Sequence, residues 1–135
     1  MREILFRGKR IIGGEWMYGS LLTDNRGQKH IIPFREIYMD GHHVCIESDW
    51  PQFFDQQTIG QFTGLTDKNG KMIFEGDKIK LTQGIGTVEW FKTQSRFMIW
   101  LPKNNEFVRF LAGIDYEVIG NIHEGATPCT SATVE

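Results

Sequence analysis

The chain of 135 residues is 40% hydrophobic and 13% aromatic, which excludes a disordered protein and allows a buried core. Its 15 basic and 17 acidic residues give a net charge of −2 at pH 7, so binding to nucleic acid by bulk attraction is not expected. The sequence has neither an apolar run of about 18 residues nor a signal-peptide core near its start. We therefore expect a cytoplasmic protein without membrane association.

The first 33 residues alternate short strand patterns with turn signals. Residues 2–6 alternate charged and apolar side chains, and residues 15–23 follow a Gly-Gly pair, so both segments are predicted to be strands. The sequence Asp-Asn-Arg-Gly at 24–27 is typical of a hairpin turn. Residues 30–32 then begin the return strand, which Pro33 ends.

The next segments mix strand and connection patterns. Residues 34–40 are interpreted as one helical turn, and residues 41–47 are predicted to be a strand. Residues 52–57 are polar and aromatic, and we interpret them as a connection that includes a helical turn. Residues 58–64 are predicted to be a strand that leads into the centre of the chain.

A tight turn is predicted at the centre of the chain. The pair Asn69-Gly70 tolerates the positive φ that hairpin turns need, and the Asp67 side chain can hydrogen-bond the backbone two residues on. Residues 72–74 then form a short apolar strand. It ends at a second turn signal, formed by Gly76 with its acidic neighbours.

The remaining chain reads as a series of short strands. Predicted strands cover residues 78–81, 87–91, 96–101, 106–111 and 116–123, with turns between them at 94–95 and 102–105. From residue 125 the sequence is small and polar, and we expect a disordered tail at 125–135.

Many short strands and no convincing helix of eight residues predict a mainly β protein. We expect two small antiparallel barrel-like units that resemble SH3-type barrels, one at 1–64 and one at 65–124. The alternative is a single compact domain that contains both.

Two segments of the first half reappear in the second half in the same order. Residues 8–15 match residues 70–77 as G-K-x-I-apolar-x-G-acid, and residues 55–61 match residues 115–121 as D-x-x-β-branched-I-G-amide. The offsets are 62 and 60 residues, so register is nearly kept. The matches predict an internal duplication, with chance similarity between β-rich segments as the alternative.

Several segments carry a resemblance to a known family. The central segment TGLTDKNGKMIFEGDKI at 63–79 resembles the hallmark of the YopX-like proteins of phages and prophages. The segments MREILFRG at 1–8, GEWMYG at 14–19, TIGQFTG at 58–64 and EVIGNIHE at 117–124 are similar to that family as well. The resemblance implies a mostly β, phage-encoded intracellular protein. The resemblance supplies no activity and no catalytic residues that could be carried over to this chain.

The acidic and histidine residues give no strong signal for a site. Glu75 and Asp77 would share a face of an extended chain, and they either cap a turn facing water or, with Glu124, form an acid–base or metal site. His42 and His43 would point to opposite faces of a strand, so they cannot bind one zinc ion together. His123 is interpreted as a surface residue. We predict no catalytic residue, no metal ligand and no cofactor.

The aromatic content is more informative than the charges. Large side chains lie in strands too short to bury all of them on one face: Trp16, Tyr18, Trp90, Met98 and Trp100. They either fill the cores of the two units or stay exposed as an interaction surface. We therefore expect a non-enzymatic protein that binds another macromolecule, with a protein partner or itself favoured.

Two alternatives to this function stay open, and self-association is predicted in addition. A single-stranded nucleic-acid-binding protein would stack bases on Trp and Phe and bind phosphates with the N-terminal arginines. A metal-dependent hydrolase would use Glu75 and Asp77. Self-association into a homodimer or larger oligomer is expected through the strands at 87–91 and 97–101, which carry no Pro and few charges that would protect a strand edge.

Overall fold

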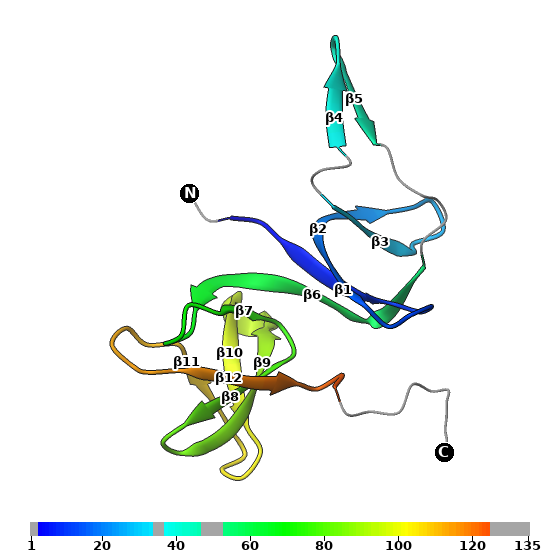
Figure 1. Ribbon diagram of the computed structural model, residues 1–135. Helices are drawn as coiled ribbons and strands as arrows, with labels where there is room; N and C mark the ends of the chain where they lie inside the picture. The colour runs from blue at the N-terminus through cyan, green and yellow to red at the C-terminus, as the bar shows by residue number, and fades with distance from the viewer. Residues whose placement is uncertain (1–2, 34–36, 47–52, 125–135) are drawn as a thin grey trace. The chain divides into compact units, whose positions relative to one another are not determined.

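The computed structural model describes residues 3–33, 37–46 and 53–124. These residues form antiparallel β-strands joined by turns, one short 3₁₀ segment at Lys92–Gln94 and no α-helix (Figure 1). The chain divides into two compact units, Met1–Phe62 and Thr63–Glu135. No helix in the described ranges has the length and apolar character to cross a membrane.

The first unit is built on one antiparallel sheet. Its strands are β1 (Phe6–Arg10), β2 (Trp16–Thr23), β3 (Lys29–Ile32) and β6 (Phe54–Thr66), in the order β3-β2-β1-β6. The last residues of β6 belong to the second unit, where β7 (Met72–Phe74) continues the same sheet. Ile31 and Phe54 are buried in the first unit, and Gly8 leaves room for both.

A separate two-stranded hairpin belongs to the first unit. Its strands are β4 (Ile37–Asp40) and β5 (His43–Ile46), with Tyr38 opposite Cys45 and Met39 opposite Val44. The predicted helical turn at 34–40 is therefore wrong for residues 37–40, because their backbone pairs with β5. Residues 34–36 lie outside the described ranges.

Two other boundaries differ from the prediction. The connection expected at 52–57, with its helical turn, is wrong for residues 54–57, since β6 begins at Phe54 and pairs there with Arg10 of β1; residue 52 lies outside the described ranges. The first strand lies at Phe6–Arg10 and not at 2–6, because β1 pairs with β2 on one side and β6 on the other. Both differences arise from partners far away in the sequence.

The second unit holds the other five-stranded sheet. Its order is β11-β10-β9-β8-β12, with β8 (Asp77–Leu81), β9 (Gly84–Phe91), β10 (Arg96–Leu101), β11 (Glu106–Arg109) and β12 (Glu117–Asn121). Alternation of apolar side chains along these strands directs one set inward. The core consists of Ile73, Ile79, Val88, Ile99, Leu101 and Tyr116.

The mainly β prediction is confirmed, and the described strands form two five-stranded antiparallel sheets and the hairpin. Within the described ranges, no pairing joins the outer strands of a sheet, so neither sheet forms a closed barrel. The structure therefore supports the two antiparallel sheets of the prediction, but it does not show the barrel-like closure of each unit.

The strands expected to associate are not at an edge of their sheet. β9 pairs with β8 through residues 84–87 and with β10 through residues 87–91, and β10 pairs with both β9 and β11, so both strands lie inside the sheet order. The prediction that these two strands offer free edges is wrong. The outer strands of this sheet are β11 and β12.

The two units share a strand order. In the first, β1, β2 and β3 follow one another across the sheet and β6 returns beside β1. In the second, β8, β9 and β10 do the same and β12 returns beside β8. Both returning pairs contain a register shift, between Arg7 and Lys9 in β1 and between Val118 and Gly120 in β12.

Only one of the two repeated sequence segments fits this common order. Residues 55–61 lie in β6 and residues 115–121 overlap β12, which are the two returning strands. The predicted equivalence of residues 8–15 with 70–77 is wrong, because Ile11 and Ile12 are exposed in a turn whereas Ile73 and Phe74 are buried in β7.

Candidate functional site

The Asp67 turn is held by its own side chain. Asp67 Oδ1 accepts hydrogen bonds from the backbone N–H groups of Asn69 (2.8 Å) and Lys71 (2.9 Å), and its Oδ2 accepts one from Val118 (3.0 Å). Gly70 has φ 80°, the positive value expected from the Asn-Gly pair. Burial alone would raise the pKa of Asp67, but the three N–H groups outweigh it and lower that pKa.

The second turn of the central segment is also closed by an acid. Asp77 is 1% exposed, and its Oδ2 accepts a hydrogen bond from the backbone N–H of Phe74 at 2.8 Å. Gly76 between the two acids has a positive φ, so the chain is not extended there and Glu75 and Asp77 do not share a strand face. Turn capping is confirmed for Asp77. The expectation that both acids face water is wrong, since Asp77 is buried.

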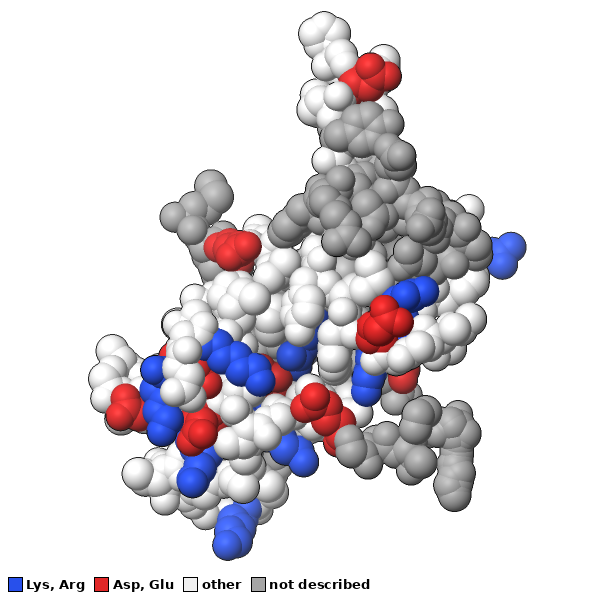
Figure 2. All heavy atoms as spheres, in the orientation of Figure 1, with Lys and Arg blue, Asp and Glu red and all other residues white. Residues whose placement is uncertain are grey.

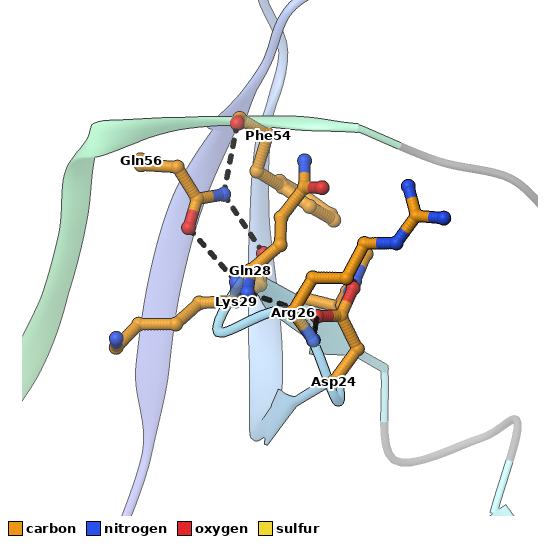
Figure 3. Close-up of polar contacts among 7 residues, drawn as sticks. Asp24, Arg26, Gln28, Lys29, Phe54 and Gln56 are labelled. Carbon is orange, nitrogen blue, oxygen red and sulfur yellow. Dashed lines mark hydrogen bonds and ion pairs between the residues drawn. The ribbon is translucent and has the colours of Figure 1, made fainter.

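A turn in the first unit repeats the geometry of the Asp67 turn. Asp24 Oδ1 accepts hydrogen bonds from the N–H groups of Arg26 and Gln28, both at 2.9 Å, and Asp24 Oδ2 lies 2.9 Å from His30 Nε2 (Figure 3). The hydrogen bond with the His30 side chain, and then those with the backbone, hold the pKa of Asp24 below its ordinary value.

The Gln56 side chain on β6 is hydrogen-bonded to the start of β3, the strand that follows this turn (Figure 3). Its Oε1 accepts a hydrogen bond from the Lys29 N–H at 2.8 Å, and its Nε2 donates to the carbonyl oxygens of Lys29 (2.9 Å) and Phe54 (3.1 Å). The amide therefore acts as an extra peptide unit between β3 and β6. These acids and amides hold turns and strands, and we interpret them as structural.

His42 and His43 lie on another unit from the acids expected to bind metal, whereas the His123 ring lies against Gly76, 3.5 Å from the position that a Cβ there would take. His42 and His43 are exposed in the β4–β5 hairpin, and the His123 N–H donates to Asn121 Oδ1 at 2.8 Å. Among residues 3–33, 37–46 and 53–124, no group of three or more His, Cys, Asp or Glu side chains is placed to hold a metal ion.

Trp16 and Tyr18 lie on β2 of the first unit. The Arg7 guanidinium lies 4.5 Å from the centre of the Trp16 ring and the Lys9 ammonium 5.7 Å, because Lys9 stands opposite Trp16 and Arg7 lies two residues from Lys9 on the same face of β1. Tyr18 is 44% exposed. Charged residues on the face shown in Figure 2 are mixed in sign over the described surface.

The three aromatic-surface residues expected in the second unit differ in exposure. Trp90 is 47% exposed and packs edge-on against Phe97 at 5.0 Å, whereas Trp100 is partly buried and lies 4.8 Å from the Phe107 ring. Met98 is buried, so it does not add to an exposed patch of rings.

A pocket of about 520 Å³ lies in the second unit. The β8–β9 turn, the start of β10, strand β11 and the β11–β12 loop line it. Met98 stands opposite Arg109 in the pairing of β10 with β11, so Arg96 and Met98 share a sheet face with Phe107 and Arg109. This volume is within the range of small-molecule sites, about 300–1,000 Å³.

Tyr116 shapes the loop side of the pocket. Its hydroxyl accepts a hydrogen bond from the Leu111 N–H at 2.7 Å, and its ring packs against Phe110 at 5.2 Å. Leu111 and Ile114 leave large apolar areas exposed in the same loop. A pocket with rings, aliphatic side chains and two arginines can bind a molecule that is apolar on one side and negative on the other.

The sequence predicted no pocket: it indicated Met98 only as a candidate for an interaction surface and did not single out Arg96, Phe107 or Arg109. The alternation of Arg96, Met98 and Trp100 along one strand already places them on one face. Their neighbours on β11 depend on the register between two strands, which that alternation does not give.

Comparison with known proteins identifies a family match and a similar structure. The family model described as YopX protein matches residues 5–127. The crystal structure of protein EF1440 from Enterococcus faecalis is similar, with 24% sequence identity and a TM-score of 0.58. The alignment covers 92% of this chain and 96% of that one, and at this identity it shows the fold alone. A search of curated proteins gives no match.

Proposed function

The chain belongs to the YopX family, and from this premise we propose that it is a phage- or prophage-encoded accessory protein of the host cytoplasm. It acts by binding other macromolecules and not by catalysis. Its first partner is a second copy of itself, in a two-fold symmetric dimer.

The β4–β5 hairpin carries this proposal. Within the described ranges it is a sheet of its own, so β4 and β5 pair with each other and each keeps an outer edge. A two-stranded hairpin is marginally stable in water unless it packs or pairs with something more. Pairing with the hairpin of a second copy would form a four-stranded sheet and satisfy one edge from each chain.

The composition of the hairpin supports pairing. Residues 37–46 contain no Pro, Lys or Arg, and Asp40 is their one acid. Proteins usually protect free strand edges with lysine, proline or a covering element. Met39 is 62% exposed, which adds apolar surface beside an unprotected edge.

Light scattering at micromolar concentration tests the dimer. The full chain should give twice its mass of 15.6 kDa, and replacing residues 37–46 by a Gly-Ser segment of equal length should give the monomer mass. Met39→Lys should weaken the dimer while keeping the hairpin. Leu22→Lys is the matched control, because Leu22 is also an exposed apolar residue but lies outside the hairpin, on β2, where it pairs with His30 of β3.

Two results would contradict the proposal. A monomer at all concentrations would exclude self-association. A dimer that survives the hairpin replacement would place the contact elsewhere, and Trp90→Ala and Tyr18→Ala would then test the exposed rings as the interaction surface.

Single-stranded nucleic acid is the second candidate partner. Lys9 approaches the Trp16 ring and Tyr18 is exposed on the same strand, which combines a cation for phosphate with rings for base stacking, whereas Arg7 is buried beside Trp16 and only supports its ring. Fluorescence titration with oligo(dT) at two salt concentrations tests it. A salt-independent signal, or one that Trp16→Leu does not change, would exclude this site.

We also propose that the two units arose by internal duplication. Their common strand order, with a returning strand beside the first strand, supports this proposal, as does the match of residues 55–61 with 115–121. The equivalent of β1 would then be β8, and not the segment at 70–77. Superposition of the two units in an experimental structure, with β1 on β8 and β6 on β12, tests the assignment.

A further inference from the structure

We propose that the pocket of the second unit binds a small organic anion, namely a carboxylate or sulfonate attached to an apolar or aromatic body. The proposal concerns a ligand site within one chain and does not depend on self-association. It rests on the charges, the lining and the size of the pocket.

The pocket lining is positive. Arg96 and Arg109 are its charged members, and the lining contains neither Asp nor Glu. This local excess contrasts with the net charge of −2 for the whole chain. Glu89 is the acid nearest in register, opposite Met98 on β9, and it is not part of the lining.

The two guanidinium groups are suited to a shared ligand. Arg109 has no ion pair or side-chain hydrogen bond within residues 3–33, 37–46 and 53–124, and its side chain is exposed. Arg96 donates from Nε, at 2.9 Å, and from Nη2 to Gln94 Oε1, which orients its guanidinium and leaves the Nη1 side for a ligand. Arginine forms two parallel hydrogen bonds with a carboxylate or sulfonate, and such charge-assisted bonds are strong.

The rest of the lining suits an apolar body. Phe107 and Tyr116 contribute rings, and Leu111 and Ile114 contribute exposed aliphatic groups. Because Phe107 packs against Phe91 at 4.7 Å and Trp100 at 4.8 Å, its ring is held in place before a ligand arrives. At about 520 Å³ the pocket accommodates a drug-sized molecule and not a folded partner.

Amide NMR of the ¹⁵N-labelled full chain tests the proposal with 1-naphthoate as probe and 1-naphthalenemethanol as its neutral analogue. Naphthoate should shift the Arg109 and Leu111 amides in a saturable manner and bind roughly tenfold more tightly than the alcohol. Arg96→Gln combined with Arg109→Gln should abolish this difference and leave the binding of the alcohol unchanged.

Two single variants control for net charge. Lys103→Gln removes a charge from the exposed β10–β11 turn outside the pocket and should leave naphthoate affinity unchanged. Glu89→Gln should raise the affinity for naphthoate, because it removes the acid that stands opposite the pocket residue Met98. Both arginines are exposed, so a dispersed spectrum of the double variant should show that it still folds.

Three results would overturn the proposal. The first is equal affinity for naphthoate and the alcohol, and the second is saturable shifts confined to residues outside the pocket. The third is a loss of naphthoate affinity in Lys103→Gln as large as the loss in the double arginine variant. An acidic peptide that binds while naphthoate does not would also overturn it, since the outer edge of β11 would then be a protein-docking surface.

Discussion

The carboxylate of Asp67 accepts a hydrogen bond from the backbone N–H of Val118 at 3.0 Å, although 51 residues separate them in the sequence. The same carboxylate closes its own turn through Asn69 and Lys71. One side chain therefore fixes a local turn and ties it to β12, the last strand of the second unit.

Asp67→Ala should destabilise the protein by about 3 kcal/mol, because it removes the acceptor of three backbone N–H groups. Asp67→Asn should cost less, since its amide oxygen still serves the turn while its NH₂ group cannot accept from Val118. Urea unfolding measures both changes.

Asp115→Ala is the control, because Asp115 is an exposed acid in the same unit. It should change the unfolding free energy by less than about 0.5 kcal/mol. If Asp67→Ala matched this control, the carboxylate would not hold β12.

Local sequence was sufficient to predict the Asp67 turn, the strand at 72–74 and the break at Gly76, because turn chemistry and alternation involve neighbouring residues. It was not sufficient for the burial of Asp77. The Gly76 N–H bonds the Val88 carbonyl of β9 and the Gly76 carbonyl accepts from Ile122, which directly follows β12, so two segments distant in sequence cover this turn. Nothing within the segment indicates them.

The sequence also did not predict which strands lie next to one another in a sheet. The strand containing Trp90 has few charges, and for this reason it was predicted to lie at a free edge. In the structure it lies between β8 and β10. The pocket illustrates the same limit, because Arg96 and Arg109 face one ligand site only after β10 and β11 pair in one register. Alternation gives the face of a residue but not its neighbour on the next strand.

The protein should lose stability in acid partly through Asp24 and Asp67. The pKa of each is lower in the folded protein than its ordinary value of 3.8, so the unfolded state binds more protons in this range. The stabilisation is complete above the ordinary pKa and is lost as pH falls through the folded pKa. Melting temperatures between pH 6 and 2 should therefore fall less steeply for Asp24→Asn with Asp67→Asn than for the native chain.

The pair Asp55→Asn with Asp115→Asn gives a comparison with the same change in charge. Its melting temperature should follow the native pH dependence. Equal slopes for the two double variants would contradict the assignment of acid sensitivity to the turn carboxylates.

Gly19→Ala should destabilise the first unit by about 3 kcal/mol through overpacking. A Cβ at Gly19 would overlap the Ile32 carbonyl and lie 2.9 Å from Pro33 Cα, and backbone atoms cannot move aside as a flexible side chain can. Gly70→Ala is the comparison, because a Cβ there meets open space and the cost is only that of φ 80° in a residue with a side chain, about 1–2 kcal/mol. A Gly19 variant no less stable than the Gly70 variant would contradict the close approach of β2 to β3.

Gln56→Glu should destabilise the protein although the two side chains have the same shape. The carboxylate still accepts from the Lys29 N–H, but it cannot donate to the carbonyl oxygens of Lys29 and Phe54, and its charge repels both. We expect a loss of about 2 kcal/mol in urea unfolding, against about 1 kcal/mol for Gln56→Ala. Hydrogen exchange gives a local readout, because the Lys29 amide should exchange faster in Gln56→Ala but stay protected in Gln56→Glu.

Gln57→Ala is the matched control, since Gln57 is the exposed neighbour of Gln56 on β6 and its backbone N–H, not its side chain, bonds Asp55. It should leave both the unfolding free energy and the Lys29 amide unchanged. If Gln56→Glu were as stable as the native chain, donation from Nε2 would contribute nothing. The link between β3 and β6 would then rest on the Lys29 N–H alone.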